Sequence, residues 1–256
     1  MSEERQQNFT VAESYSLPSG GKIYDVRVNP NVELRSMTAR DEMKRLNPSS
    51  TPLKSLADII EGCMLEKPAI HVYDMCIGDF DYLLHQLRIV TYGPEFKVTV
   101  QCQDCGEWVD TTADLEALTL KEFNEAEFEA LKTFSLPKSG RTITLKFFTP
   151  RLMDEIEAKS RELKRKHKTA DIDFSTYSKL MTCIDLVDGV KLGIIDLENT
   201  VNTLPAADMM KILNNLEKLN QCIGLDNELI VTCPKCGSDI HTFFRYGPEF
   251  FRPSNL

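Results

Sequence analysis

The chain has 256 residues, of which 42% are hydrophobic and 27% charged, so wholesale disorder is excluded and one large domain or two small ones can form. The formal net charge is −9, and such an acidic surface repels phosphate backbones, which argues against general nucleic-acid binding. Residues 1–8 contain no apolar run, and no stretch reaches the roughly 18 apolar residues of a membrane span, so we expect a cytosolic protein without a signal peptide or membrane contact.

The first half of the chain predicts a mixture of strands and helices. Its opening strand follows a Gly-containing turn, and Tyr24, Val26 and Val28 share one face of that strand. Asp79 is placed as the N-cap of the last helix. The predicted elements are a turn at 16–22, a strand at 23–28, helices at 38–46, 53–64 and 79–87, and a strand at 96–101.

The second half repeats this order. Ser135-Leu136-Pro137-Lys138-Ser139-Gly140-Arg141 matches Ser16-Leu17-Pro18-Ser19-Gly20-Gly21-Lys22, and Asp208 takes the place of Asp79. The predicted elements are a turn at 135–141, a strand at 142–148, helices at 150–167, 177–186 and 208–216, and a strand at 229–232. Because several matches occur in the same order, we interpret the chain as an internal duplication.

The duplication predicts an α+β fold of two pseudo-symmetric lobes. The first repeat lobe is placed at residues 1–109 and the second at 134–245. Residues 110–133 form an acidic connecting segment without Pro or Gly, in which 118–131 is predicted to be helical. Residues 246–256 form a C-terminal tail whose aromatic side chains could contact a partner or pack on the chain itself.

Each half ends in a Cys-x-x-Cys-Gly knuckle. Cys102 and Cys105 form the first, and Cys233 and Cys236 form the second. Two residues between thiols let a tight turn direct both sulfurs at one metal ion, and the following Gly can adopt the positive φ that such a turn needs. Each knuckle stands between two β-type runs, as in a zinc ribbon. Since tetrahedral zinc takes four ligands, the two knuckles together predict one closed, structural zinc site that joins the two halves.

Other interpretations of the knuckles are open. The two pairs are separated by 127 residues, where about 15–20 is usual in a zinc ribbon. Cys233 and Cys236 could bind a metal with His241, each pair could be a redox site, or the thiols could carry no metal. The remaining cysteines lie singly in apolar stretches and are expected to be buried and inert; they are Cys63, Cys76, Cys183 and Cys222.

The rest of the sequence shows no familiar catalytic pattern. It contains four histidines but no His-Glu-x-x-His pair, and neither a Gly-x-Ser-x-Gly elbow nor a Walker-type loop. Asp79 and Asp81 are expected to cap or to be solvated, and His85 to lie packed or solvated on a helix. The basic run 161–168 is expected to be a solvated helix end, with contact to an acidic partner or nucleic acid as the alternative. Tyr-Gly-Pro-Glu-Phe occurs twice, at 92–96 and 246–250, without an evident reason.

Several segments together resemble the baseplate hub assembly proteins of T-even-type contractile-tailed bacteriophages. They are Leu17-Pro18-Ser19-Gly20-Gly21-Lys22, residues 79–88, and Tyr92-Gly93 leading to Cys102-Gln103-Asp104-Cys105-Gly106. The resemblance covers most of the chain and carries over no catalytic residue. It implies a non-enzymatic protein of the host cytoplasm, and of the virion where it stays in the baseplate. Its partners would be other tail and baseplate proteins, with no nucleic acid, membrane or small-molecule substrate.

Two other classes of function remain. One is a zinc-ribbon adaptor or nucleic-acid-binding protein of the transcription or replication machinery, although the net charge and the scarcity of cations around the knuckles argue against it. The other is an enzyme with a structural zinc, for which the sequence offers no recognisable site.

Overall fold

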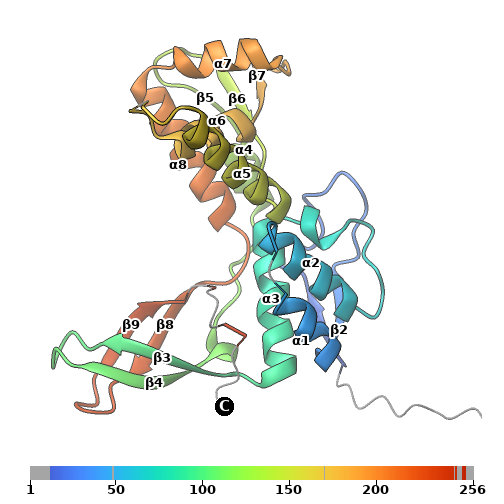
Figure 1. The fold of residues 1–256 in the computed structure, drawn as a ribbon, viewed down its shortest axis with the longest axis vertical. Helices are drawn as coiled ribbons and strands as arrows, with labels where there is room; N and C mark the ends of the chain where they lie inside the picture. The colour runs from blue at the N-terminus through green and yellow to red at the C-terminus, as the bar shows by residue number, and fades with distance from the viewer. Residues whose placement is uncertain (1–11, 48, 170, 245, 247–249, 252–256) are drawn as a thin grey trace, which may run out of the picture.

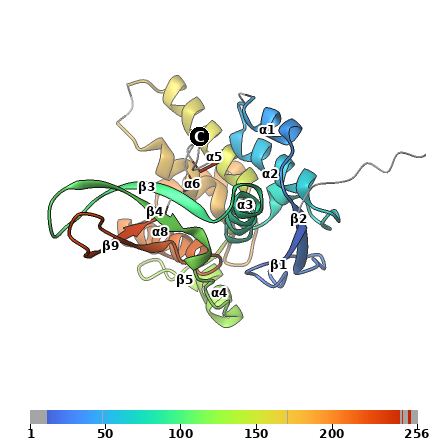
Figure 2. The same cartoon turned by 90° about the horizontal axis from the view of Figure 1, so that it is seen from below.

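The computed structural model describes residues 12–47, 49–169, 171–244, 246 and 250–251, and these form three parts (Figure 1). We call residues 12–92 the first lobe and residues 125–221 the second lobe. Two β-hairpins, one from each half of the chain, lie together and project away from both lobes in both views (Figures 1 and 2). We call this pair, residues 95–114 and 228–243, the arm. No helix within the described residues is long and apolar enough to cross a membrane.

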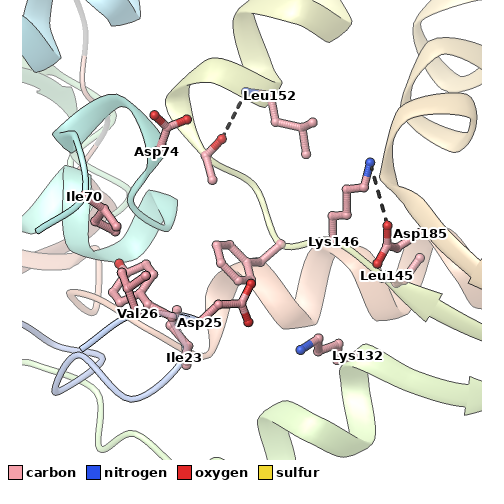
Figure 3. Close-up of a pocket in the computed structure, with 13 residues that line it drawn as sticks. Ile23, Asp25, Val26, Ile70, Asp74, Lys132, Leu145, Lys146, Leu152 and Asp185 are labelled. Carbon is pink, nitrogen blue, oxygen red and sulfur yellow. Dashed lines mark hydrogen bonds and ion pairs between the residues drawn. The ribbon is translucent and has the colours of Figure 1, made fainter. Parts of the chain in front are cut away.

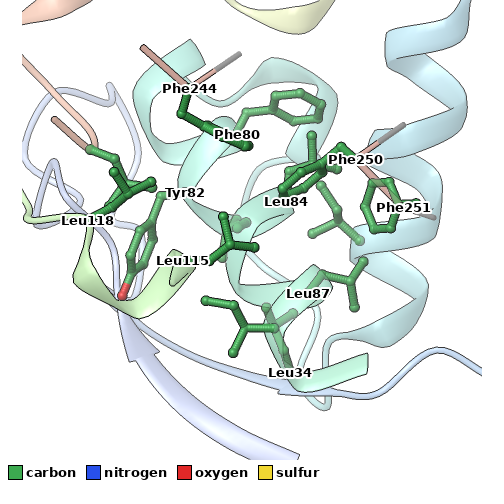
Figure 4. Close-up of a cluster of buried hydrophobic side chains, with 14 of the residues drawn as sticks. Leu34, Phe80, Tyr82, Leu84, Leu87, Leu115, Leu118, Phe244, Phe250 and Phe251 are labelled. Atoms are coloured by element: carbon green, nitrogen blue, oxygen red, sulfur yellow. The ribbon is translucent and has the colours of Figure 1, made fainter. Parts of the chain in front are cut away.

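The first lobe packs its strands and short helices around one long helix. Thr38 caps α1 with a full capping box, since its side chain accepts from the N–H of Asp41 and the Asp41 carboxylate accepts from the N–H of Thr38. The core lies along α3, where apolar side chains from the strands and helices converge (Figure 4). The elements are β1 (Ala12–Ser16), β2 (Asn31–Arg35), α1 (Ala39–Arg45), α2 (Pro52–Cys63), η1 (Val72–Asp74) and α3 (Ile77–Tyr92), with β1 and β2 antiparallel.

The second lobe has a small antiparallel sheet of order β5-β6-β7, and its core is a second cluster of apolar side chains to which Cys76 of the first lobe contributes. Asn124 caps α4 and Thr149 caps α5, in both cases through a side-chain oxygen that accepts a backbone N–H. The elements are α4 (Glu125–Lys132), β5 (Thr133–Ser135), β6 (Thr142–Leu145), α5 (Pro150–Lys166), α6 (Phe174–Cys183), β7 (Ile184–Val187), α7 (Ile194–Asn202) and α8 (Ala206–Gln221).

The arm consists of two antiparallel ribbons whose inner faces pack on each other. Residues alternate between buried and exposed along β4 and β8, as expected for strands with one face in a core. The inner side chains are Val109, Ala113, Leu229, Val231 and Ile240. The strands are β3 (Glu95–Gln101), β4 (Trp108–Asp114), β8 (Glu228–Thr232) and β9 (Asp239–Phe243), and the short helix η2 (Leu115–Ala117) follows β4.

Several sequence predictions need correction. The strand predicted at 23–28 is an irregular segment, and β2 is the corresponding strand. The apolar alternation of residues 23–28 does not reflect a strand. The Tyr24 side chain instead points inward, where its hydroxyl donates to the buried Asp79 carboxylate at 2.6 Å. The helix predicted from residue 118 begins at Glu125, since Leu120 instead forms an isolated β-bridge with Leu225. The strand expected at 142–148 ends at Leu145. The helix predicted at 177–186 ends at Cys183, and β7 begins at the next residue.

Asp79 and Asp208 are not N-caps, because Cys76 and Pro205 precede the first turns of α3 and α8. Both aspartates are the third residue of their helix and bind the preceding Leu-Pro turn. The N–H of Ser19 donates to Asp79 at 2.9 Å, and the N–H of Lys138 donates to Asp208 at 2.8 Å. The two turns are thus bound to the two helices in the same way.

A second contact also occurs in both lobes. The chain leaving α2 bridges β2 through Leu34 and Met64, and the chain leaving α6 pairs with β6 through Leu145 and Ile184. The residue before each bridge is a buried cysteine, Cys63 or Cys183. The two lobes therefore share the order strand, strand, helix, helix, returning chain and long helix. The returning chain is the strand β7 in the second lobe but a single bridge in the first, and the first lobe has the short η1 where the second has α7.

The two lobes contact each other directly, outside the arm. The Tyr73 hydroxyl of the first lobe donates to Asp154 of the second at 3.0 Å. Arg151 forms an ion pair with Asp74 at 2.5 Å. At the start of α3, Gly78 lies so close to the chain after α8 that an added Cβ would stand 2.4 Å from the carbonyl oxygen of Ile223. The junction between the lobes is therefore closely packed without a contribution from the four cysteines of the two knuckles.

We expect Gly78→Ala to destabilise the protein by about 1–3 kcal/mol, because the new methyl group must displace backbone at this junction. Gly62→Ala is the matched control. An added Cβ at Gly62 meets nothing within 4 Å, so this substitution in α2 should be neutral or stabilise by up to ~1 kcal/mol. Urea unfolding midpoints of both variants measure the difference. Equal stabilities would contradict the close packing at Gly78.

Candidate metal centre

The two cysteine knuckles form the free ends of the arm. Cys102–Gly106 is the turn between β3 and β4, and Cys233–Gly237 is the turn between β8 and β9. Both turns lie at the ends of the ribbons that point away from the lobes (Figure 1). The sequence predicts that a metal here would join the two lobes; the structure places the cysteines where they join the two ribbons instead.

The two turns share one backbone geometry. In the first, the N–H of Cys102 donates to the carbonyl of Glu107 at 2.9 Å, and in the second the N–H of Cys233 donates to the carbonyl of Ser238 at 2.8 Å. The glycine of each turn donates its N–H to the carbonyl of the first cysteine, and both glycines have positive φ, 74° at Gly106 and 78° at Gly237. This conformation favours glycine, as the motif predicts.

The four sulfur atoms lie together. Cys102 Sγ is 3.6 Å from Cys236 Sγ, and Cys105 Sγ is 3.9 Å from Cys233 Sγ, so each close pair joins the two halves of the chain. All four lie within 4.8 Å of one another. Four thiolates bound tetrahedrally at about 2.3 Å would be spaced by about 3.8 Å. The residues therefore fit a metal ion, and within the described part of the chain no other group of three His, Cys, Asp or Glu residues lies close enough to do so.

Hydrogen bonds to the sulfurs favour their ionised form. The backbone N–H of Cys105 and then the hydroxyl of Ser238 lower the pKa of Cys102 to about 6. The Ser238 hydroxyl, 2.8 Å from Cys236 Sγ, also lowers the pKa of Cys236. Although the backbone N–H of Glu107 favours the thiolate of Cys105, desolvation and the neighbouring Cys102 sulfur raise the pKa of Cys105 to about 11. Such a cluster holds four thiolates only if a cation compensates their charge.

Contacts between the ribbons support the cluster. The Lys235 ammonium of the second knuckle lies 2.9 Å from the Glu107 carboxylate of the first. Further along the arm, the Thr111 hydroxyl donates to the carbonyl of Thr232 at 3.3 Å. Ser238 is the functional residue that the sequence analysis did not single out. Its position directly after Cys-Gly, where the first knuckle has Glu107, is the signal that could have identified it.

The alternative site residues lie elsewhere. His241 is on β9 with its Nδ1 2.9 Å from a Glu228 oxygen, and it does not belong to the sulfur cluster. Neither knuckle begins a helix, which is the position of a thioredoxin-like redox pair. The single cysteines Cys63, Cys76 and Cys183 are buried as predicted, whereas Cys222 is half-buried.

His85, which the sequence places on a helix, is a buried residue of α3 with a structural environment. His85 is buried with Nε2 2.9 Å from the carbonyl of Leu115, and burial lowers its pKa to about 4, so its ring stays neutral at pH 7.

A cavity of about 530 Å³ opens between the lobes (Figure 3). The polar groups that line it are Tyr24, Asp25, Asp74, Lys132, Lys146, Thr149 and Asp185, a set without histidine, cysteine or serine.

Comparison with known proteins gives one match. The model of the family described as T4 bacteriophage base plate protein matches residues 10–252. No curated protein and no solved structure matches the chain.

Proposed function

Because the chain belongs to the T4 bacteriophage base plate protein family, we propose that it acts in the baseplate hub of a contractile-tailed phage, without catalysis, by binding other tail proteins. The family match over residues 10–252 is the observation that carries this proposal. The protein would be made in the host cytoplasm and act there as an assembly factor or enter the virion as part of the baseplate. No nucleic acid, membrane or small-molecule substrate is needed for such a role.

We propose further that Cys102, Cys105, Cys233 and Cys236 bind one structural zinc ion. The sulfur spacing supports this, and so does the ligand set, because four thiolates are typical of structural zinc. Such a site leaves no coordination position for water or substrate. The alternative of a nucleic-acid-binding ribbon is less well supported, since Lys235, the cation of the two knuckles, is bound to Glu107.

We also propose that the two halves arose by duplication. The equivalent Asp79 and Asp208 contacts and the equivalent returning chains after Cys63 and Cys183 support this origin. Repeat lobes at 1–109 and 134–245, the connection at 110–133 and the tail at 246–256 remain our proposed division. In this division β4 runs from Trp108 to Asp114 across the first boundary, so the first ribbon of the arm takes in residues of the connection as well. Residues 1–11, 247–249 and 252–256 lie outside the described residues.

Deleting the gene from its phage should abolish infectious particles and leave baseplates incomplete, because the proposed role is in building the baseplate. Electron microscopy of lysates and plaque counts measure this, with restoration from a plasmid-borne copy as the control. Mass spectrometry of purified baseplates then separates a structural component, which is present, from an assembly factor, which is absent. Normal tails without the protein would contradict the proposed function.

A further inference from the structure

The arm carries the chain's single tryptophan on its outer surface. Trp108 is the first residue of β4, directly after the first knuckle, and its side chain is 66% exposed. Its neighbour Val109 faces the other ribbon and is 4% exposed, so the alternation of the strand directs Trp108 away from the arm's own core. Tryptophan is among the residues that contribute most to protein interfaces, and exposure of its large apolar ring to water is unfavourable.

The cysteine cluster stiffens the part of the chain that presents this ring. Trp108 lies three residues after Cys105, and its strand partner Gln101 comes directly before Cys102. The lobes do not need the cluster to stay together, because Tyr73, Asp74 and Gly78 join them directly. A rigid free end lowers the entropy cost of binding, since fewer conformations are lost when a partner is bound. The cluster therefore stabilises the free end of the arm rather than the junction between the lobes.

The charged residues near Trp108 indicate what kind of surface the end of the arm could bind. Asp104, Glu107 and Asp110 are exposed and lie within four residues of Trp108, while residues 102–110 contain no lysine or arginine. In the facing knuckle, the ammonium of Lys235 is bound to Glu107. The end of the arm thus presents an apolar ring on a segment that carries exposed carboxylates, those of Asp104 and Asp110, without a lysine or arginine of its own. Its electrostatic complement is a protein surface with an apolar recess bordered by lysine or arginine. A nucleic acid would be repelled.

We propose that the end of the arm, centred on Trp108, is a docking site for a basic, apolar surface on another baseplate protein. This inference rests on the proposed function, which it makes specific to one part of the molecule. The tryptophan inserts into the recess, and Asp104 and Asp110 face the cations at its border. The metal centre keeps the two ribbons in the orientation that presents the ring.

Photo-cross-linking during infection tests this contact. A phage that lacks the gene is complemented with the chain carrying a benzophenone amino acid at position 108. We expect a cross-link to a different baseplate protein, within a segment that contains lysine or arginine. Cross-linking only to a second copy, to nucleic acid or to nothing, in cells that still form baseplates, would overturn the proposal. If no baseplate requires the protein at all, it is the proposed function that fails.

Substitutions provide a second measurement. Trp108→Ser should weaken binding to the cross-linked protein about 30-fold, which corresponds to ~2 kcal/mol for an interface residue of this kind, and should lower complementation by at least about tenfold. Asp110→Lys should weaken binding and make it less sensitive to added salt, because one attractive charge is replaced by a repulsive one. Trp108→Phe and Ile194→Ser should stay within about threefold of wild type. Ile194 is an apolar residue of the second lobe that is at least as exposed as Trp108. All four should keep their metal. Normal binding and complementation by Trp108→Ser would refute the docking site.

Discussion

Replacing Cys102 or Cys236 with serine should release the metal ion and unfold the free end of the arm, while both lobes keep their helices and stay in contact. The two sulfurs are 3.6 Å apart and come from different ribbons, so either change removes one of four ligands and one link between ribbons. Structural zinc contributes about 10–16 kcal/mol of binding free energy that is coupled to folding. The apolar contacts between the ribbons, such as Val109 and Val231, lie nearer the lobes, whereas the turns at the free end are joined chiefly through the cysteines, so we expect the free end to lose its structure first.

The lobes should remain docked because their contacts lie far from the cysteines. The Tyr73–Asp154 hydrogen bond, the Arg151–Asp74 ion pair and the bond from the N–H of Ile77 to the carbonyl of Phe148 at 2.8 Å all join the lobes directly. A metal that clamped the lobes, as the sequence predicts, would leave them separated when it is lost. A metal at the end of the arm predicts damage limited to residues 95–114 and 228–243.

Metal analysis and hydrogen exchange distinguish these results. Wild-type protein should contain about one zinc per chain, and each variant less than about a tenth of that. Amide exchange should accelerate in the arm, with little change in far-ultraviolet circular dichroism or in the exchange of α3, α5 and α8. Cys222→Ser is the control, because this half-buried thiol only donates to the carbonyl of Leu219. A variant that retains its zinc, or lobes that open together with the arm, would contradict this assignment.

The sequence predicted the elements that depend on neighbouring residues. The helices at 38–46 and 53–64 are found within one or two residues because a capping Thr38 and an early Pro52 determine where they begin. The conformation of the two cysteine turns also depends only on neighbouring residues, so the motif predicts the positive φ of Gly106 and Gly237. The predicted strand at 23–28 failed because Tyr24 bonds to Asp79, 55 residues away, and local alternation holds no information about that partner.

The position of the candidate site depended on distant contacts. Which four cysteines lie together follows from their spacing and number. Whether they join lobes or ribbons depends on Gly78 approaching Ile223 and on Tyr73 meeting Asp154, and neither pairing leaves a trace in the local sequence. The role of the second Tyr-Gly-Pro-Glu-Phe segment was not predictable for the same reason, since its partner lies on α3.

Arg88 contacts both Tyr-Gly-Pro-Glu-Phe segments. It is on α3 with a fully buried side chain, and it donates to the carbonyls of Gly93 and, at 2.9 Å, Glu95 in the first segment. Its Nε also donates at 3.0 Å to the carbonyl of Phe250, the last residue of the second segment. The rings of Phe96 and Phe250 lie 6.0 Å apart. One buried guanidinium therefore bonds to both segments and attaches the base of the arm and Phe250 to the first lobe.

We expect Arg88→Met to destabilise the protein by about 1–3 kcal/mol, because it leaves the buried carbonyl of Phe250 and the carbonyl of Glu95 without this donor while keeping most of the side-chain volume. Arg141→Met is the control: Arg141 is a partly exposed arginine paired with Asp188, and its loss should cost no more than about 1 kcal/mol. Removal of residues 250–256 should also destabilise strongly, since the rings of Phe250 and Phe251 are buried.

The losses of unfolding free energy caused by Arg88→Met and by removal of residues 250–256 should not be additive. Because Arg88 and Phe250 share one contact, truncation should cost much less in the Arg88→Met background than in the wild type, and a double-mutant cycle of urea unfolding free energies measures the difference. Strict additivity would show that the guanidinium stabilises α3 and the first Tyr-Gly-Pro-Glu-Phe segment independently of the chain's end. Coupling of 1 kcal/mol or more, within the range of roughly 0.5–3 kcal/mol seen for residues in contact, would establish that the end of the chain is held by Arg88.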